Sequence, residues 1–225
     1  FLLRDSNFVG GEVLLNTEQA FSANIPNGLA LKGQIKHLDI AAWQDIAEAF
    51  HEQDAHAGNE EASILDIPEQ LAQMDLIIDE LVINQDNTLH NAKMNYPVKQ
   101  ALRFSSDEMN FELTTKEYGP DLHFNFLSWN LSKEEADENA VNEPFIHADQ
   151  VPNMTLTIDQ LYLDNSPYGD WSAKIQREGN VVRLTSIKSA LKTGEFNGSL
   201  FWQDQDDRSN VELTIGVKGK DLAEL

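Results

Sequence analysis

The sequence contains no cysteine, few basic residues and no long apolar run. The absence of cysteine excludes disulfide bonds and thiol chemistry, although it identifies no compartment. Only 16 Lys and Arg stand against 38 Asp and Glu, which gives a formal net charge of −22. Binding to nucleic acid or directly to an anionic membrane needs a basic surface. The charge balance therefore argues against both, and we expect no nucleic-acid partner.

No apolar run approaches the roughly 18 residues of a membrane-spanning helix, so we expect no membrane span within this chain. No signal peptide is visible either. The chain starts at Phe1 without methionine, and we interpret it as a piece of a longer protein. Its 225 residues, 41% of them hydrophobic and 24% charged, are enough for a sizeable folded core.

Strand patterns dominate the chain, because apolar and polar residues alternate in many short stretches. The turn signals between them leave mostly short connections, and short connections favour antiparallel meanders. The sequence therefore predicts a mainly β fold: a curved, twisted antiparallel sheet, either an open groove or flattened and barrel-like, with short edge helices. The predicted strands are residues 13–15, 29–40, 74–83, 101–104, 109–113, 122–131, 154–163, 171–175, 181–187, 196–202 and 211–217.

One helix is predicted over Ile40–Glu52, where four apolar residues form a single helical stripe and Asp39 can cap the N-terminus. The stretch SKEEADENAVNE at 132–143 contains five acids and little to bury. It predicts a flexible, solvated loop over residues 132–144.

The phrase MTLTIDQLYL at 154–163 nearly repeats MDLIIDELVI at 74–83. In both, the apolar residues occupy every second position, and after two polar residues they move to the other set of alternate positions, which is a change of parity. Similar shifts occur over Ile35–Ile40 and Phe126–Leu131. A change of parity turns the apolar set to the other face unless a residue bulges out. We interpret each shift as a bulge that keeps the apolar residues on one face and curves the sheet.

These echoes indicate an elongated β segment built from irregular repeats. We expect approximate repeat units at 1–56, 57–131 and 145–225, with the acidic loop 132–144 between the last two.

The phrase GLALKGQIKHLDIAAWQDI at 28–46 resembles the strand, Leu-Asp-Leu and Trp-containing helix of AsmA-like proteins. Residues 151–225 resemble the C-terminal part of the YhdP branch of that family, with Pro152, Gly169 and Gly198–Trp202 at its marked positions. The resemblance implies a periplasmic protein anchored in the inner membrane of a Gram-negative bacterium. It also implies transport of phospholipids to the outer membrane along an apolar groove. The expected partners are phospholipid acyl chains, with outer-membrane or periplasmic proteins as further candidates.

An antiparallel sheet with one apolar face must cover that face with protein or with lipid. The expected apolar, lipid-groove residues are Leu76, Ile78, Leu81, Ile83, Leu122, Phe124, Phe126, Leu156, Ile158, Leu161, Leu163, Leu200 and Trp202. The alternative left open by the sequence is a closed β-sandwich that binds or scaffolds a protein or glycan.

No residue set predicts catalysis or a cofactor. His51 and His56 are spaced i, i+5, whereas a helical zinc motif needs i, i+4. The acidic turn at 204–210 lacks the Gly and the Glu of a calcium loop. We therefore expect no enzyme activity and no cofactor.

Overall fold

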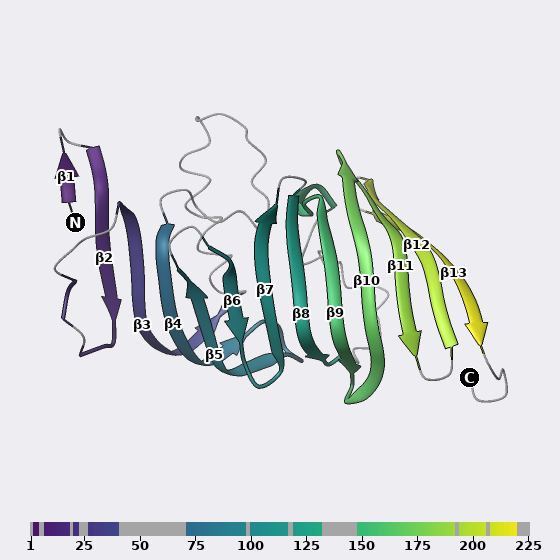
Figure 1. Cartoon of the computed structure of the whole chain (residues 1–225), viewed down its shortest axis with the longest axis horizontal. Coiled ribbons are helices and arrows are strands. Elements are labelled where there is room, and N and C mark those ends of the chain that lie inside the picture. Colours follow the sequence, from purple (N-terminus) through teal and green to yellow (C-terminus); the bar gives the residue numbers. More distant parts are fainter. Residues whose placement is uncertain are drawn as a thin grey trace. The chain divides into compact units, whose positions relative to one another are not determined.

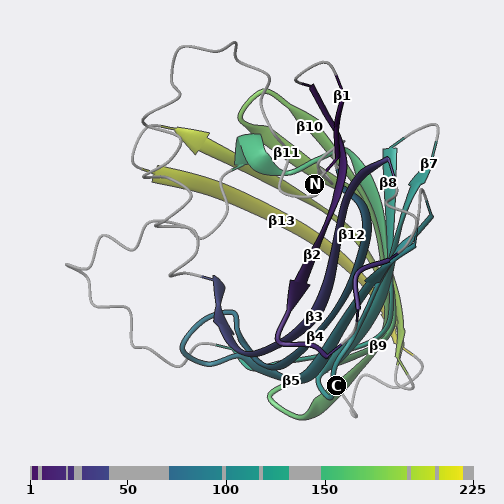
Figure 2. The ribbon, with the colours of Figure 1, turned by 90° about the vertical axis from the view of Figure 1, so that its left-hand side faces the viewer.

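The computed structural model describes residues 2–4, 7–18, 20–22, 27–40, 71–97, 100–116, 119–131, 148–191, 194–205 and 208–219. The chain divides into two compact units. The first comprises Phe1–Asn59 with Ile67–Thr114, and the second comprises Glu60–Asp66 with Thr115–Leu225. The predicted curved, open and mainly β fold is confirmed (Figure 1 and Figure 2). The predicted repeat boundaries stay a prediction.

The strands of the first unit lie side by side in chain order. They are β1 (Leu2–Arg4), β2 (Asn7–Leu15), β3 (Gly28–Asp39), β4 (Leu71–Val82), β5 (Thr88–Tyr96), β6 (Leu102–Ser105) and β7 (Met109–Lys116). β2, β3 and β4 are parallel to one another. The pairs β1–β2, β4–β5, β5–β6 and β6–β7 are antiparallel.

The second unit, like the first, contains parallel strands followed by an antiparallel meander. Its strands are β8 (Gly119–Trp129), β9 (Met154–Leu163), β10 (Ser166–Glu178), β11 (Val181–Leu191), β12 (Gly194–Gln205) and β13 (Arg208–Gly219). β8 and β9 are parallel, and every later pair is antiparallel. A short 3-10 helix, η1 (Ala148–Gln150), precedes β9.

Most pairs are antiparallel, as predicted, but β2–β3, β3–β4 and β8–β9 are parallel, which the sequence did not predict. These pairs are joined by the three longest connections, residues 16–27, 40–70 and 130–153. A parallel neighbour requires the chain to return along the whole strand, which takes about a dozen residues or more. Long connections therefore mark the parallel pairs, and short connections mark the antiparallel pairs.

The predicted helix over Ile40–Glu52 lies outside the described residues except for Ile40, and the predicted acidic loop lies outside them beyond Leu131. β5 was not predicted, because a change of parity at Asn91 interrupts its alternation of Leu89 with Ala92 and Met94. Asn91 has a φ of 54°, a left-handed conformation that asparagine tolerates better than most residues.

The crossover between β2 and β3 is held by one buried carboxylate. Glu12 has a side chain only 3% exposed, and its Oε1 lies 2.8 Å from Lys32 Nζ. Ser22, from the crossover, donates its backbone N–H and its hydroxyl to the same carboxylate at 2.7 and 2.8 Å. The Lys32 hydrogen bond, followed by those from Ser22, lowers the pKa of Glu12 from its usual 4.5 to about 2.

Candidate functional site

The apolar residues predicted on β4 are packed core. Leu76, Ile78 and Leu81 are 5%, 0% and 5% exposed, whereas Ile77 between them is 42% exposed. Ile83 follows the end of the strand and is half-buried. An uninterrupted alternation would place Leu81 on the same face as the exposed Ile77. The burial of Leu81 therefore indicates that the parity change at Asp79 keeps Ile78 and Leu81 on one face.

The mechanism of this change differs from the predicted bulge. Met74 pairs with Tyr96 and Val82 with Thr88, so the register between β4 and β5 is the same before and after Asp79. β3 also keeps its register with β4, from Leu31 paired with Met74 to Leu38 paired with Leu81. A bulge would place an extra residue on one strand only. Here the neighbouring strands carry matched irregularities at the same level, and Figure 2 shows β3 curling toward its end.

Polar contacts join the strands at this level. Gln34 Nε2 donates to Asp79 Oδ1 at 2.8 Å, and His37 Nδ1 lies 3.3 Å from Glu80 Oε2. In the second unit, His123 Nε2 lies 3.0 Å from Asp159 Oδ2 across the parallel β8–β9 pair. The polar residues of the parity change are therefore used for cross-strand contacts.

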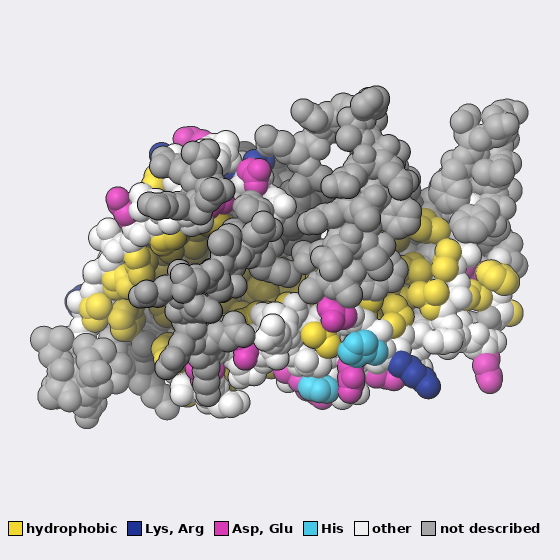
Figure 3. Space-filling model, turned by 180° about the vertical axis from the view of Figure 1, so that it is seen from behind, with side chains coloured by type: hydrophobic (Ala, Val, Ile, Leu, Met, Phe, Trp, Pro, Cys, Tyr) yellow, Lys and Arg dark blue, Asp and Glu magenta, His cyan; other side chains and the backbone are white. Residues whose placement is uncertain are grey.

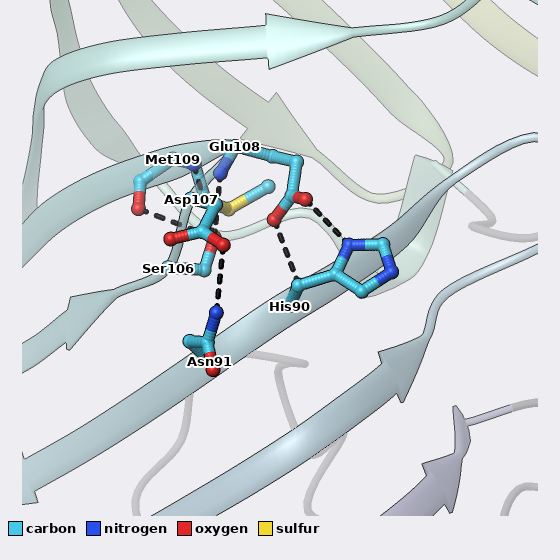
Figure 4. A network of polar contacts seen from close by, with 6 residues as sticks. All are labelled: His90, Asn91, Ser106, Asp107, Glu108 and Met109. Carbon is cyan, nitrogen blue, oxygen red and sulfur yellow. Dashed lines mark hydrogen bonds and ion pairs between the residues drawn. The ribbon is translucent and has the colours of Figure 1, made fainter.

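A second set of contacts anchors β5 to the β6–β7 turn (Figure 4). Glu108 accepts a hydrogen bond from the backbone N–H of His90 at 2.8 Å and contacts His90 Nδ1 at 2.7 Å. Asn91 Nδ2 donates to Asp107 Oδ2 at 2.7 Å. The hydrogen bond to Glu108 raises the pKa of His90 above its usual 6.5.

In the second unit, the predicted residues of β8 and β9 form matched rows. Leu122 pairs with Leu156, and Phe124 pairs with Ile158. Paired residues of neighbouring strands point to the same face, so these four side chains share one face. Ile158 is 7% exposed, and the other three are half-buried.

Register corrects one predicted phrase. The pairing of β8 with β9 breaks at Asn125 and Phe126 and resumes where Leu127 meets Leu161. The phrase equivalent to Ile158–Leu163 is therefore Phe124–Trp129, two residues before the predicted Phe126–Leu131. The sequence could not show this difference of two residues, because Phe124 and Phe126 both fit the same alternating pattern of apolar residues. Phe126 is half-buried and lies within the break.

The same face continues to the last strand of the unit. Leu200 pairs with Leu184 on β11 and with Leu213 on β13. Trp202 pairs with Val182 and with Val211 in the same way. The register of β11 shifts between Leu184 and Ile187, where Ser186 has a φ of 54°, so a bulge keeps the apolar residues of β11 on this face.

The exposure of this face rises toward β13. Val182 is 1% exposed, and Leu200 and Trp202 are half-buried. Figure 3 shows hydrophobic side chains gathered on the face of β11–β13 that is seen from behind. The apolar residues of β13 are between 47% and 56% exposed; they are Val211, Leu213, Ile215 and Val217. The second unit therefore presents an apolar surface that is only partly covered.

The 3-10 helix η1 lies against β11 and β12. Ala148 is fully buried, and its backbone N–H donates to Asp204 Oδ2 at 2.7 Å. Asp204 Oδ1 also accepts from Trp202 Nε1 at 2.8 Å and from Ser209 Oγ at 2.6 Å. Asp204, considered above for calcium, therefore serves here as a structural acceptor.

Sequence reasoning missed several residues of this face. They are Leu127, Trp171, Ala173, Ile175, Val182, Leu184, Phe196 and the β13 residues. The alternation of Trp171, Ala173 and Ile175 could have indicated that these three side chains share one face. The sequence could not indicate that their strand lies beside β9, because that depends on strand pairing.

The described residues contain no group of three His, Cys, Asp or Glu that could hold a metal ion. His51 and His56 lie outside them. A cleft of about 500 Å³ near the start of β9 is lined mostly by polar residues, among them Lys174, Gln176 and Arg183, together with Met154 and Ile175. Lys174 and Gln176 alternate with Ala173 and Ile175, so they face away from the apolar surface.

None of the helices within the described ranges has the length and apolar character that a membrane crossing requires. Comparison with curated proteins found no match, and comparison with solved structures found none either. A family model described as YhdP protein matches residues 3–225. That match covers nearly the whole chain, so the resemblance seen in its phrases is confirmed, and the chain belongs to the YhdP family of AsmA-like proteins.

Proposed function

We propose that this chain is a non-enzymatic segment of a periplasmic, inner-membrane-anchored protein that carries phospholipids between the inner and outer membranes. In this proposal the acyl chains lie against the apolar face of the second unit. The transport would support the lipid balance and the barrier of the outer membrane. Membership of the YhdP family supports the protein class.

The observation that carries the proposal is a row of partly covered apolar side chains that crosses neighbouring strands. From Leu184 through Leu200 to Leu213, each strand contributes one apolar residue at the same level. An elongated apolar surface of this kind matches an acyl chain better than it matches a compact polar ligand. The predicted residues of β4 are buried, so they contribute to the core rather than to this surface.

Energetics favour movement along a surface over release into water. Burying an acyl chain contributes about 0.8 kcal/mol per CH₂, so a whole chain is held by roughly 10 kcal/mol. Release into water would cost that amount at each step, whereas sliding along a continuous apolar surface keeps most of the chain covered. The net charge of −22 would keep the polar face of the protein away from anionic membranes.

The test is to purify the chain from bacteria without detergent and to measure bound phospholipid by mass spectrometry. The informative variant is Leu200→Asp, which places a charge on the apolar face. The matched control is Ser199→Asp, which adds the same charge at the neighbouring exposed position on the other face. We expect bound lipid in the wild type and in S199D, and at least severalfold less in L200D.

Equal lipid in both variants would refute the assignment of the apolar face. A wild-type protein without lipid, and unable to take up phospholipid from vesicles, would refute the proposed function.

A further inference from the structure

Ser189 on β11 is a buried hydroxyl on the apolar face. It pairs with Trp171 on β10 and with Phe196 on β12, so the three side chains point the same way. Ser189 is 4% exposed, and its Oγ has no hydrogen-bond partner among the described residues. Such unsatisfied groups are few in folded proteins, and each has a physical cause.

Two aromatic rings flank this hydroxyl. Trp171 and Phe196 stand two strands apart, which corresponds to about 9.6 Å in a sheet. Their ring centroids are nevertheless only 6.4 Å apart, at an interplanar angle of 30°. The rings therefore lean toward each other above the strand that carries Ser189. Trp171 Nε1 donates to the backbone oxygen of Tyr168 at 2.7 Å, which fixes the position of the indole.

Packing alone does not explain a serine at this position. A small residue is needed beneath the two rings, and alanine would serve without burying a polar atom. Leaving a buried hydroxyl unpaired costs stability relative to alanine. A hydroxyl can both donate and accept a hydrogen bond, so a bound group could satisfy it.

The surroundings define the chemistry of that group. The paired neighbours in this row are Ile158, Trp171, Phe196 and Val217, none of which is charged. An anion such as a phosphate would lose its hydration here without a cation to replace it. A neutral acceptor attached to an apolar chain fits, and the ester carbonyl of an acyl lipid is such a group.

We propose that Trp171, Ser189 and Phe196 form a binding site for the ester carbonyl of an acyl chain. The ligand inserts between the two half-buried rings, and Ser189 Oγ donates to the carbonyl oxygen. This inference rests on the proposed function, because it places the polar end of the acyl chain within the same apolar face.

The test compares a diacyl phosphatidylglycerol with its diether analogue, which has the same chains and head group but no ester carbonyl. Binding of each lipid to the whole chain is measured by competition against a fluorescent fatty-acid probe. We expect the wild type to bind the ester lipid about threefold to tenfold more tightly, the effect of one neutral hydrogen bond. Ser189→Ala should bind both lipids equally, whereas the control Ser172→Ala should keep the preference.

The possible outcomes separate the two proposals. A wild type that binds both lipids equally would overturn the ester site and leave the proposed function standing. A wild type that binds neither would overturn the proposed function. Ser189→Ala should also unfold at the same temperature as the wild type or at a higher one, because it removes a buried hydroxyl. A lower unfolding temperature would show that the hydroxyl has a structural role, and it would overturn the site.

Discussion

Replacing Gly33 by alanine should separate β2 from β3. Gly33 has a φ of 135°, a conformation that residues with a Cβ rarely adopt. A Cβ at this position would lie 1.9 Å from the backbone oxygen of Leu15 and under 3 Å from two other backbone atoms of that residue. Backbone cannot rotate away as a side chain can, so the strand itself must move.

The magnitude follows from two contributions. The unfavourable φ costs about 1–3 kcal/mol. Moving Leu15 also breaks the end of the parallel ladder, where Leu15 pairs with Gly33, and each lost backbone hydrogen bond costs about 1 kcal/mol. We expect Gly33→Ala to lower the free energy of unfolding of the first unit by about 2–4 kcal/mol.

A matched control separates crowding from backbone strain. Gly179 has a φ of 62°, and a Cβ there would meet no atom within 4 Å. Gly179→Ala should therefore cost only about 1–2 kcal/mol from the conformation alone. Hydrogen exchange of the β2 amides, followed by mass spectrometry, is the direct assay, with urea unfolding as the global measure. If exchange in β2 is unchanged in Gly33→Ala, or if both variants lose the same stability, the reasoning is refuted.

Three further predictions concern ionisable groups. The pKa of Glu12 is lowered from 4.5 to about 2 in the folded state, so its contribution to stability is present above pH 4.5 and is lost as the pH falls toward 2. Acid unfolding should show this pH dependence of stability, and Glu12→Gln should reduce it. The pKa of His90 is raised above 6.5, so its contribution is complete below pH 6.5 and is lost as the pH rises through the folded-state pKa. In an NMR titration, Glu108→Gln should return the His90 pKa toward 6.5, and an unchanged value would contradict the contact. Asp204→Ala removes the acceptor of the Ala148 N–H, so exchange of that amide should become about tenfold faster, and unchanged exchange would show that Asp204 does not hold η1.

The predicted β class was sound because it rested on a local property. Alternation with a period of two fixes which side chains of a strand share a face. The sequence predicted β9 as residues 154–163, which are its observed bounds. It also predicted that Ile78 and Leu81, on either side of the parity change at Asp79, lie on the same face, and both are buried.

The candidate site was predicted only in part, because its extent depends on pairing. Leu200 and Trp202 show an alternating pattern in the sequence, and the pairing with β11 and β13 decides which neighbours extend their face. Burial also differs between similar phrases. Leu76 and Ile78 are closed from solvent, whereas Leu156 and Leu161 in the second phrase are half-buried.

The sequence by itself determined the strand-rich class, the acidic character, the family phrases and the apolar side of most strands. These depend on composition and on neighbours a few residues apart. Only the tertiary structure decided which pairs are parallel, where neighbouring strands match their parity changes, and how Trp171 and Phe196 cover Ser189. These features arise between residues on different strands, and the free energy of such contacts depends on register, which a local pattern does not specify.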